Sequence, residues 1–207
     1  MTSTAAPLIL RLGFYGGAFD PPHAAHHALA EAAIAQLELD QLCIFPTGQT
    51  WHRAQQPSAA QHRLAMARLA FADLPLVQVD ARETLRTGAT YTVDTLTELR
   101  AEYPHAELFL IMGTDQFAAF STWRRWQDIT QIATVCVAAR ASSASENAIK
   151  GNPNTPSVAC KMLNISMPAM STSATDIRRR VGQGLGIDHL VKPSVARYIA
   201  QHHLYSH

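Results

Sequence analysis

The residues with the clearest chemical potential are two histidines that follow a pair of glycines near the N-terminus. They lie in residues 16–26 (GGAFDPPHAAH), directly after an apolar run. His23 and His26 are three residues apart, so both imidazoles project to the same side of a helical turn. At the positive end of a helix dipole such a pair can donate hydrogen bonds to an anion, and glycines let backbone amides approach a phosphate. The segment therefore predicts a phosphate-binding loop.

The same histidines could also have a plain structural role or bind a metal. A pair in a first helical turn can simply be solvated. A zinc pair is disfavoured because no carboxylate or third ligand is evident nearby, so we expect no protein-held metal. His27 is expected at the surface. Asp20 followed by Pro21 resembles a helix N-cap and first helical residue, and a helix start a few residues later is also open.

A second group of polar residues lies about 150 residues further along the chain, in residues 173–178 (SATDIR). Ser173 with Asp176 approximates a capping box, which predicts the start of a helix. Near that helix N-terminus, Thr175 and Arg178 offer a hydroxyl and a forked cation suited to a triphosphate. The alternative is that residues 178–180 are a solvated basic run.

These residues must be positioned by strands and helices that alternate along the chain. Apolar runs predict strands at 8–15, 42–45, 76–79, 108–112 and 134–138, and helical spacing predicts helices at 24–37, 61–71, 93–103, 173–180 and 193–202. Residues 47–57 and 141–157 are expected to be loops. This order predicts an α/β fold with a doubly wound, mostly parallel, Rossmann-like sheet, in which ligands bind beyond the carboxyl ends of the strands.

Composition limits the class of protein. The chain has 207 residues, of which 47% are hydrophobic, so we expect one domain over 1–207 with C-terminal helices from about 173 packing on it. A formal net charge of +1 gives no global attraction to nucleic acid or to anionic membranes. Three widely spaced cysteines argue against a disulfide framework, and no run is long enough to span a membrane. A cytoplasmic protein is expected.

The two polar groups together resemble the nucleotidylyltransferase superfamily. Residues 16–26 match its G-G-x-F-D-P-x-H-x-x-H signature, and residues 172–178 match its I-S-S-T-x-I-R signature, with Thr172 for Ile and Ala174 for the second Ser. One departure is Ala25, where the superfamily has a glycine against which adenine packs. The resemblance implies a Rossmann-like nucleotidylyltransferase fold with His23, His26 and Arg178 as catalytic residues. It implies an ATP site formed by Gly16, Gly17, Ala18, Phe19, His23, His26, Ser173, Thr175 and Arg178.

The segments between the two signatures are similar to those of the nicotinate mononucleotide adenylyltransferases. They are residues 51–53 (WHR), 90–92 (TYT), 111–115 (IMGTD) and 121–123 (STW). The resemblance implies a mononucleotide site formed by His52, Arg53, Tyr91, Thr92, Gly113, Asp115, Trp123, Arg124 and Arg140.

Each of these residue types has a chemical rationale and an ordinary structural alternative. Trp123 offers a flat face for a pyridine ring, but many tryptophans are only packing residues. Asp115 suits ribose hydroxyls and could equally cap a helix. Thr92 can donate to a carboxylate, and a cation at Arg124 favours the acid over the amide. Arg53 and Arg140 suit phosphates, with solvated surface positions as the alternative.

The resemblance implies that the protein joins ATP, with Mg²⁺, and nicotinate mononucleotide to give nicotinate adenine dinucleotide and pyrophosphate in NAD biosynthesis. Neither nucleic acid nor a membrane is an expected partner, and a homo-oligomer is left open. Three alternatives remain: a nicotinamide-preferring enzyme, a pantetheine-phosphate or flavin mononucleotide adenylyltransferase, and a nucleotide-binding sensor that has lost catalysis.

Overall fold

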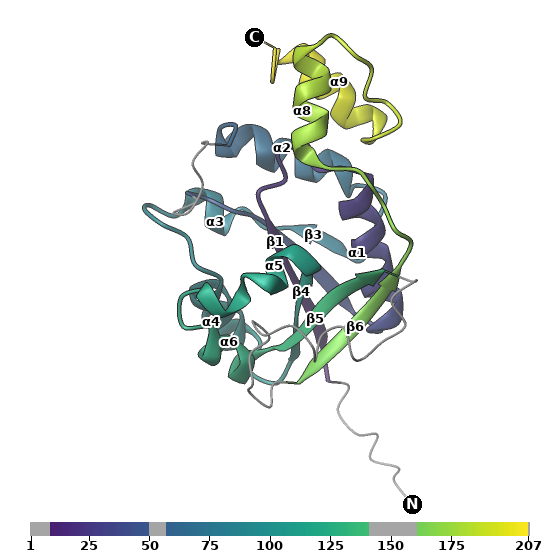
Figure 1. The fold of residues 1–207 in the computed structure, drawn as a ribbon. Coiled ribbons are helices and arrows are strands. Elements are labelled where there is room, and N and C mark those ends of the chain that lie inside the picture. Colours follow the sequence, from purple (N-terminus) through teal and green to yellow (C-terminus); the bar gives the residue numbers. More distant parts are fainter. Residues whose placement is uncertain (1–8, 50–56, 141–160, 207) are drawn as a thin grey trace, which may run out of the picture.

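The computed structural model describes residues 9–49, 57–140 and 161–206. Within these ranges one sheet contains six parallel strands in the order β3-β2-β1-β4-β5-β6 (Figure 1). The strands are β1 (Arg11–Gly17), β2 (Gln41–Pro46), β3 (Val77–Val79), β4 (Glu107–Gly113), β5 (Thr134–Arg140) and β6 (Met162–Met167). The predicted doubly wound α/β fold is therefore confirmed, and the sheet is parallel throughout.

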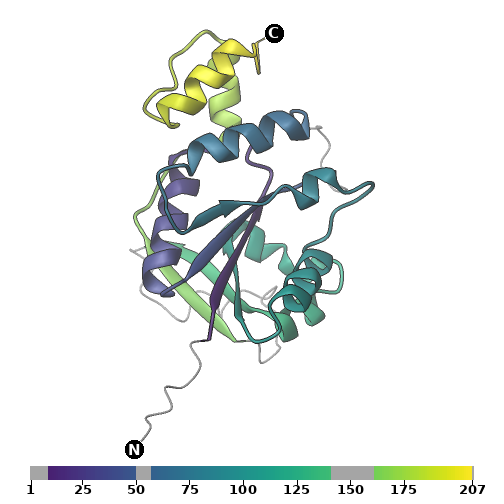
Figure 2. The same ribbon diagram turned by 180° about the vertical axis from the view of Figure 1, so that it is seen from behind.

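Helices connect the strands and cover both faces of the sheet, as Figures 1 and 2 show from opposite sides. They are α1 (Ala24–Gln36), α2 (Ala60–Ala70), α3 (Arg82–Leu85), α4 (Thr92–Glu102), α5 (Thr114–Ala118), the 3₁₀ turn η1 (Phe120–Thr122), α6 (Trp126–Ile132), α8 (Ala174–Gly182) and α9 (Pro193–Gln201). Parallel strands need such crossovers, and a right-handed crossover places successive helices on one face.

The alternation of side chains along β1 divides the core into two layers. Leu12 and Phe14 pack with the apolar residues of α4 and α6 on one face. Tyr15 packs on the other face with residues of α1, α2 and α9. The C-terminal helices belong to this second layer because Ile177 of α8 and Ile199 of α9 are buried in it.

The strand order reverses between β1 and β4, which makes this pair the topological switch point of the sheet. From β1 the chain winds toward β3 in one direction, and from β4 toward β6 in the other. Loops leaving two such strands diverge and open a crevice at their carboxyl ends, where ligands of doubly wound sheets bind. β1 ends at Gly17 and β4 at Gly113, so both predicted substrate loops leave the carboxyl edge of the sheet at this switch point.

The predicted helix start at residue 24 is confirmed: α1 begins at Ala24 with His23 in the extended N-cap conformation, so Asp20 is not its N-cap. Several other elements were not predicted. The strand β6 was not predicted, because it lies at the edge of the sheet with Leu163 exposed and only Ile165 fully buried. The helices α3, α5 and α6 are too short to show a clear helical period. Residue 8 of the first predicted strand, the loop 141–157 and most of the loop 47–57 lie outside the described residues.

Candidate active site

The predicted histidine pair forms one compact unit at the start of α1. The imidazole rings of His23 and His26 are stacked, with centroids 3.8 Å apart and planes inclined by 29°. The edge of the Phe19 ring packs against His26 at a centroid distance of 5.1 Å. Both rings therefore lie on the same side of the first helical turn, as the spacing predicts.

Hydrogen bonding determines which nitrogen of His26 carries the proton. The backbone N–H of His23 donates to Nδ1 of His26 over 3.2 Å, so Nδ1 is unprotonated and Nε2 carries the hydrogen. Nδ1 of His23 is buried and no hydrogen bond satisfies it. A buried polar atom without a partner is unfavourable until a ligand or water supplies one. The pair thus offers an anion the Nε2–H of His26 as a donor, and the ring of His23 has a nitrogen that still lacks a partner.

Burial keeps both imidazoles neutral in the free protein. It lowers the pKa of His23 to about 4. Burial also lowers the pKa of His26 well below its ordinary value, and the adjacent His23 ring lowers it further. Donation from a neutral imidazole needs no proton uptake near neutral pH, since Nε2–H of His26 is already present.

These pKa shifts predict how stability depends on pH. The folded protein protonates His23 near pH 4, whereas the unfolded chain does so near 6.5. The unfolded state therefore binds more protons in this window, and the free energy of unfolding is expected to fall as the pH drops from 6.5 toward 4. From the linkage relation a shift of this size contributes about 3 kcal/mol.

Urea unfolding of wild type and of His23→Asn at several pH values in this window measures the effect. The wild type should have the steeper slope, and His105→Asn, which replaces an exposed histidine, should match the wild type. Buried Glu83 acts in the opposite direction: burial raises its pKa to about 7, so it lowers stability as the pH rises from 4.5 toward 7. The test therefore compares the pH slopes of wild type and variant, in which Glu83 is the same. Equal slopes in wild type and His23→Asn would contradict the lowered pKa of His23.

The second predicted group, on α8, lies against the first. Nη1 of Arg178 donates to the backbone carbonyl of Asp20 over 2.7 Å, across 158 positions of the sequence. Nη2 of the same guanidinium donates to Oγ1 of Thr175 over 3.3 Å. Only part of its donor capacity is thereby used, and the planar fork is held beside the loop that leads into the histidine pair.

The start of α8 is built as its sequence predicts. Ser173 is the N-cap, and its hydroxyl accepts a hydrogen bond from the backbone N–H of Asp176 over 3.1 Å. This contact begins the helix one residue later and places Thr175 and Arg178 in its first turns. The N-terminus of α8 therefore adds its positive dipole end to the same region.

The two glycines that end β1 lie against aromatic rings that leave little room for a side chain. A Cβ on Gly16 would lie 2.9 Å from Cε1 of Phe14, and one on Gly17 would lie 3.1 Å from Cζ of Phe19. Phe19 itself is 1% exposed and has a φ of 49°, a left-handed conformation that a bulky residue rarely adopts. Between Gly17 and Phe19, the carbonyl of Ala18 accepts a hydrogen bond from buried Arg63.

The predicted mononucleotide residues that the structure describes lie at and after the end of β4 and at the start of α4, with Arg140 at the end of β5. Gly113 is the N-cap of α5, and Asp115 is exposed on its first turn. Trp123 is half-buried, with its ring against the edge of buried Phe120 at 5.5 Å. Thr92 is the first residue of α4, so the first amides of this helix have no acceptor within it.

Arg124 extends over the ring of Tyr91. Its Cζ lies 4.5 Å from the ring centroid, within the range of a cation–π contact. Tyr91 is the N-cap of α4, so this contact holds a cation next to the N-terminal amides of that helix. The arrangement suits a ligand with a negative group and a flat ring.

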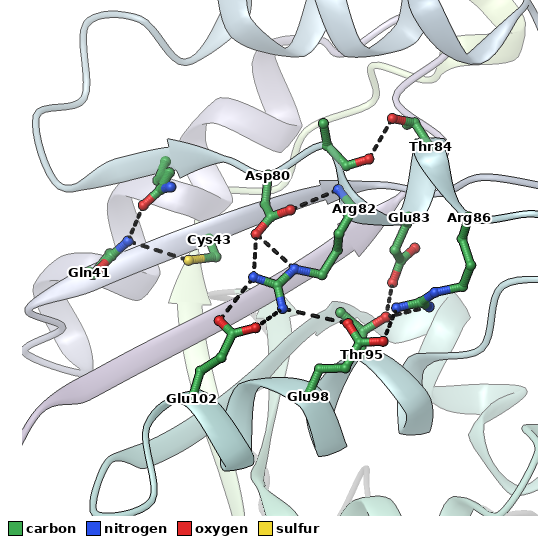
Figure 3. Close-up of polar contacts among 12 residues, drawn as sticks. Gln41, Cys43, Asp80, Arg82, Glu83, Thr84, Arg86, Thr95, Glu98 and Glu102 are labelled. Atoms are coloured by element: carbon green, nitrogen blue, oxygen red, sulfur yellow. Dashed lines mark hydrogen bonds and ion pairs between the residues drawn. The ribbon is translucent and has the colours of Figure 1, made fainter.

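A polar network fixes the connection that carries Tyr91 (Figure 3). Arg82 on α3 bridges Asp80 and Glu102, with Nε to Oδ2 at 2.9 Å and Nη1 to Oε1 at 2.6 Å.

A second arginine ties the same segment to α4. Arg86 donates to Thr95 and Glu98 on α4, and Thr95 donates to buried Glu83 over 2.8 Å. Both ends of the segment between α3 and α4 are therefore anchored, which limits where Thr92 can lie.

The amino-acid sequence is similar to those of known nucleotide-transferring enzymes. A sequence profile of the Cytidylyltransferase-like family matches residues 14–180. The chain is 52% identical over 195 residues to a protein of Albidiferax ferrireducens and 39% identical over 195 residues to one of Bordetella avium. Both carry the name "Probable nicotinate-nucleotide adenylyltransferase", and each alignment covers 94% of this chain and 98% of the relative. The chain belongs to the nicotinate-nucleotide adenylyltransferase family.

A solved structure shares the fold of this adenylyltransferase. It is the Plasmodium falciparum nicotinic acid mononucleotide adenylyltransferase complexed with NaAD, at a TM-score of 0.74 and 18% sequence identity. The match covers 95% of this chain and 97% of that one. In the part of the chain that the structure describes, no helix is long and apolar enough to cross a membrane.

Some predicted site residues of the adenylyltransferase are not placed. His52 and Arg53 lie outside the described residues. Arg140 is the last residue of β5, paired with Met167 of β6, so its backbone lies at the carboxyl edge of the sheet.

Two residues hold the β1–α1 loop in place, and neither was predicted to do so. Arg63 of α2 is 1% exposed and donates to the carbonyls of Ala18 at 2.9 Å and Ser58 at 2.8 Å. Asp20, expected to cap α1, is 5% exposed and instead holds several segments together through its carboxylate and carbonyl. An arginine in a helix and an acid before a proline give no local signal of such tertiary roles.

Proposed function

We propose that this chain joins ATP to nicotinate mononucleotide, forming nicotinate adenine dinucleotide and releasing pyrophosphate. The observation that carries the proposal is the hydrogen bond between Arg178 and the Asp20 carbonyl, since it holds the late arginine beside the loop that leads into the histidine pair. Family membership supports the choice of substrates.

In the proposed site, the phosphates of ATP lie between the two segments. The amides of Gly16, Gly17 and Ala18 and the imidazoles of His23 and His26 face them from the β1–α1 side. Ser173, Thr175 and Arg178 face them from α8. Nε2–H of His26 and the free N–H groups of Arg178 are suited to the negative charge that develops on the α-phosphate and the leaving pyrophosphate.

The reaction needs no dedicated general base. The nucleophile is a phosphate oxygen of the mononucleotide, whose second pKa of about 6 leaves it largely dianionic at neutral pH. It attacks the α-phosphorus of ATP in line with the departing pyrophosphate, and the bond between the α-phosphorus and the bridging oxygen breaks. The enzyme supplies alignment and charge neutralisation, for which fixed donors are sufficient.

We propose that Mg²⁺ enters bound to ATP rather than as a resident ion. Mg²⁺ prefers oxygen ligands, whereas the donors at this site are imidazoles, amides and a guanidinium. The described residues include no group of three or more His, Cys, Asp or Glu placed to hold an ion. The nearby carboxylate of Asp20 is already occupied by Tyr205 and the Ser58 amide. When bound, the ion would neutralise phosphate charge.

The mononucleotide is proposed to bind across the crevice. Trp123 stacks on the pyridine ring, Asp115 binds ribose hydroxyls, and the start of α4 at Thr92 receives the carboxylate beside Arg124. The stacked Arg124–Tyr91 pair supports this orientation because it holds positive charge at that helix end. A neutral carboxamide would gain less from this charge than the acid does.

Replacing Trp123 by alanine is expected to weaken mononucleotide binding by about 10-fold, because a stacked ring is worth about 0.5–1.5 kcal/mol beyond its burial. The KM for ATP should change little. Calorimetric titration with nicotinate mononucleotide measures the affinity, and Trp126→Ala on the neighbouring helix α6 is the matched control. An unchanged affinity in Trp123→Ala would assign this tryptophan a packing role only.

Pyrophosphate release tests the proposed function directly. The enzyme is assayed with MgATP and, in parallel, nicotinate mononucleotide, nicotinamide mononucleotide or phosphopantetheine. We expect release with the first substrate and much slower release with the others. No release with any of them would contradict the enzyme assignment, and faster release with the amide would contradict the proposed carboxylate site.

We also propose a cytoplasmic location. It is supported by Cys43 and Cys136, which are buried as free thiols, an arrangement typical of proteins in reducing compartments.

A further inference from the structure

Asp20 joins its own loop to three distant parts of the chain. Its backbone carbonyl accepts from Arg178 of α8 over 2.7 Å. Its carboxylate accepts from the backbone N–H of Ser58 at Oδ2 over 3.1 Å and from the hydroxyl of Tyr205 at Oδ1 over 2.6 Å. Asp20 is 5% exposed, so these contacts replace water around a buried carboxylate.

Tyr205 is brought to Asp20 by the turn that ends α9. His203 and Tyr205 have φ values of 49° and 65°, and Leu204 donates its N–H to the Ile199 carbonyl. This turn directs the chain back toward the β1–α1 loop, and the carbonyl of Tyr205 lies near Gly182 of α8. Burial and the charge of Asp20 raise the pKa of the Tyr205 hydroxyl, so it stays protonated and donates.

The contacts form a connected path that ends on the arginine of the proposed site. Tyr205 binds one oxygen of Asp20, the Asp20 backbone binds Nη1 of Arg178, and Thr175 binds Nη2. The arginine is therefore oriented by a neighbouring backbone whose own position depends on Tyr205. Loss of the tyrosine hydroxyl would leave Oδ1 of Asp20 buried without its donor, which favours a shift of this loop.

We propose that Tyr205 is a positioning residue for adenylyl transfer: its hydroxyl fixes Asp20, and the Asp20 carbonyl orients the Arg178 guanidinium toward the phosphates of ATP. The inference rests on the proposed function and extends it to the C-terminal end of the chain. Tyr205 itself touches neither substrate.

Tyr205→Phe is the direct test because it removes one oxygen and keeps the ring. We expect kcat to fall about 10-fold, the loss of one well-oriented hydrogen bond. The KM for nicotinate mononucleotide should be unchanged, because the effect acts through the phosphate side of the site. A purely structural role would lower the melting temperature and leave the kcat of the folded enzyme unaltered.

Tyr198→Phe is the matched control. Its hydroxyl also makes a hydrogen bond from the C-terminal region, to Nδ1 of His62 at 3.0 Å, but it does not contact Asp20. We expect Tyr198→Phe to keep the wild-type kcat. An equal loss in both variants would show a general loosening of α9 and overturn the inference.

The same substitution in an Arg178→Ala background separates positioning from other effects. If Tyr205 acts through Arg178, Tyr205→Phe should produce no further loss in that background. A loss of about 10-fold that persists there, or a wild-type kcat in the single Tyr205→Phe variant, would overturn the inference and leave the proposed function intact. An inactive wild type would overturn both.

If Tyr205→Phe does not accumulate as folded protein, Asp20→Ala tests the other partner of the same hydrogen bond. It removes the oxygen that accepts from Tyr205 and keeps the backbone carbonyl that accepts from Arg178. We expect a fall in kcat that disappears in the Arg178→Ala background. A fall that is unchanged in that background would overturn the inference.

Discussion

His26→Ala is expected to lower kcat by about 100-fold or more, because removing one preorganised donor to a developing oxyanion costs about 2.7–4 kcal/mol. His26 is the donor whose proton position is already set, since its Nδ1 accepts from the His23 backbone and leaves Nε2–H free. Steady-state pyrophosphate release at saturating substrates measures the change. The KM values should move less than kcat, because the developing charge is greatest in the transition state.

Two further variants make this prediction specific. His26→Gln returns an N–H near the position of Nε2 and should recover part of the lost rate. His27→Ala removes the adjacent histidine, whose ring lies near Asp73 and Glu31 at 3.0 Å and 3.2 Å, and should stay within a few-fold of wild type. Wild-type turnover in His26→Ala would exclude this histidine from the transition state.

Arg178→Ala is expected to lower kcat/KM for ATP by about 100- to 1000-fold. The guanidinium places a fixed cation on the phosphate side of the site, and its fork matches phosphate oxygens. Arg178→Lys keeps the charge but cannot bond Asp20, Thr175 and a phosphate together in one plane, so it should remain at least about 10-fold impaired.

Arg179→Ala provides the matched control, because this neighbouring side chain is 58% exposed and pairs with Asp176 of its own helix. It should retain wild-type kcat/KM. Circular dichroism and urea unfolding check that Arg178→Ala remains folded without its bond to the β1–α1 loop. A folded Arg178→Ala enzyme with wild-type kcat/KM for ATP would remove this arginine from the proposed site.

The parts of the site that the sequence could predict are those encoded within a few residues. His23 and His26 are neighbours on a helical turn, and Ser173 caps α8 through the N–H of Asp176, so spacing alone locates them. The apolar runs of β1, β2, β4 and β5 likewise predict a parallel sheet, because strands buried on both faces are continuously hydrophobic.

The parts that could not be predicted depend on contacts between distant residues. The helix at 61–71 was predicted from apolar residues at helical spacing, and Met66 and Ala67 are buried, yet Arg63 is also buried because carbonyls of two loops surround its guanidinium. A charged residue in a helix is ordinarily assigned to solvent. Asp20 and Tyr205 are 185 positions apart, and only the tertiary fold brings them together.

The proposed phosphate site is tested most directly by a crystal structure of the enzyme with MgATP in a form that cannot be cleaved at the α-phosphate. We predict that Nε2 of His26 and the guanidinium of Arg178 both lie within hydrogen-bonding distance of phosphate oxygens of the same nucleotide. A nucleotide whose phosphates contact only one of the two, or lie elsewhere on the molecule, would contradict this prediction.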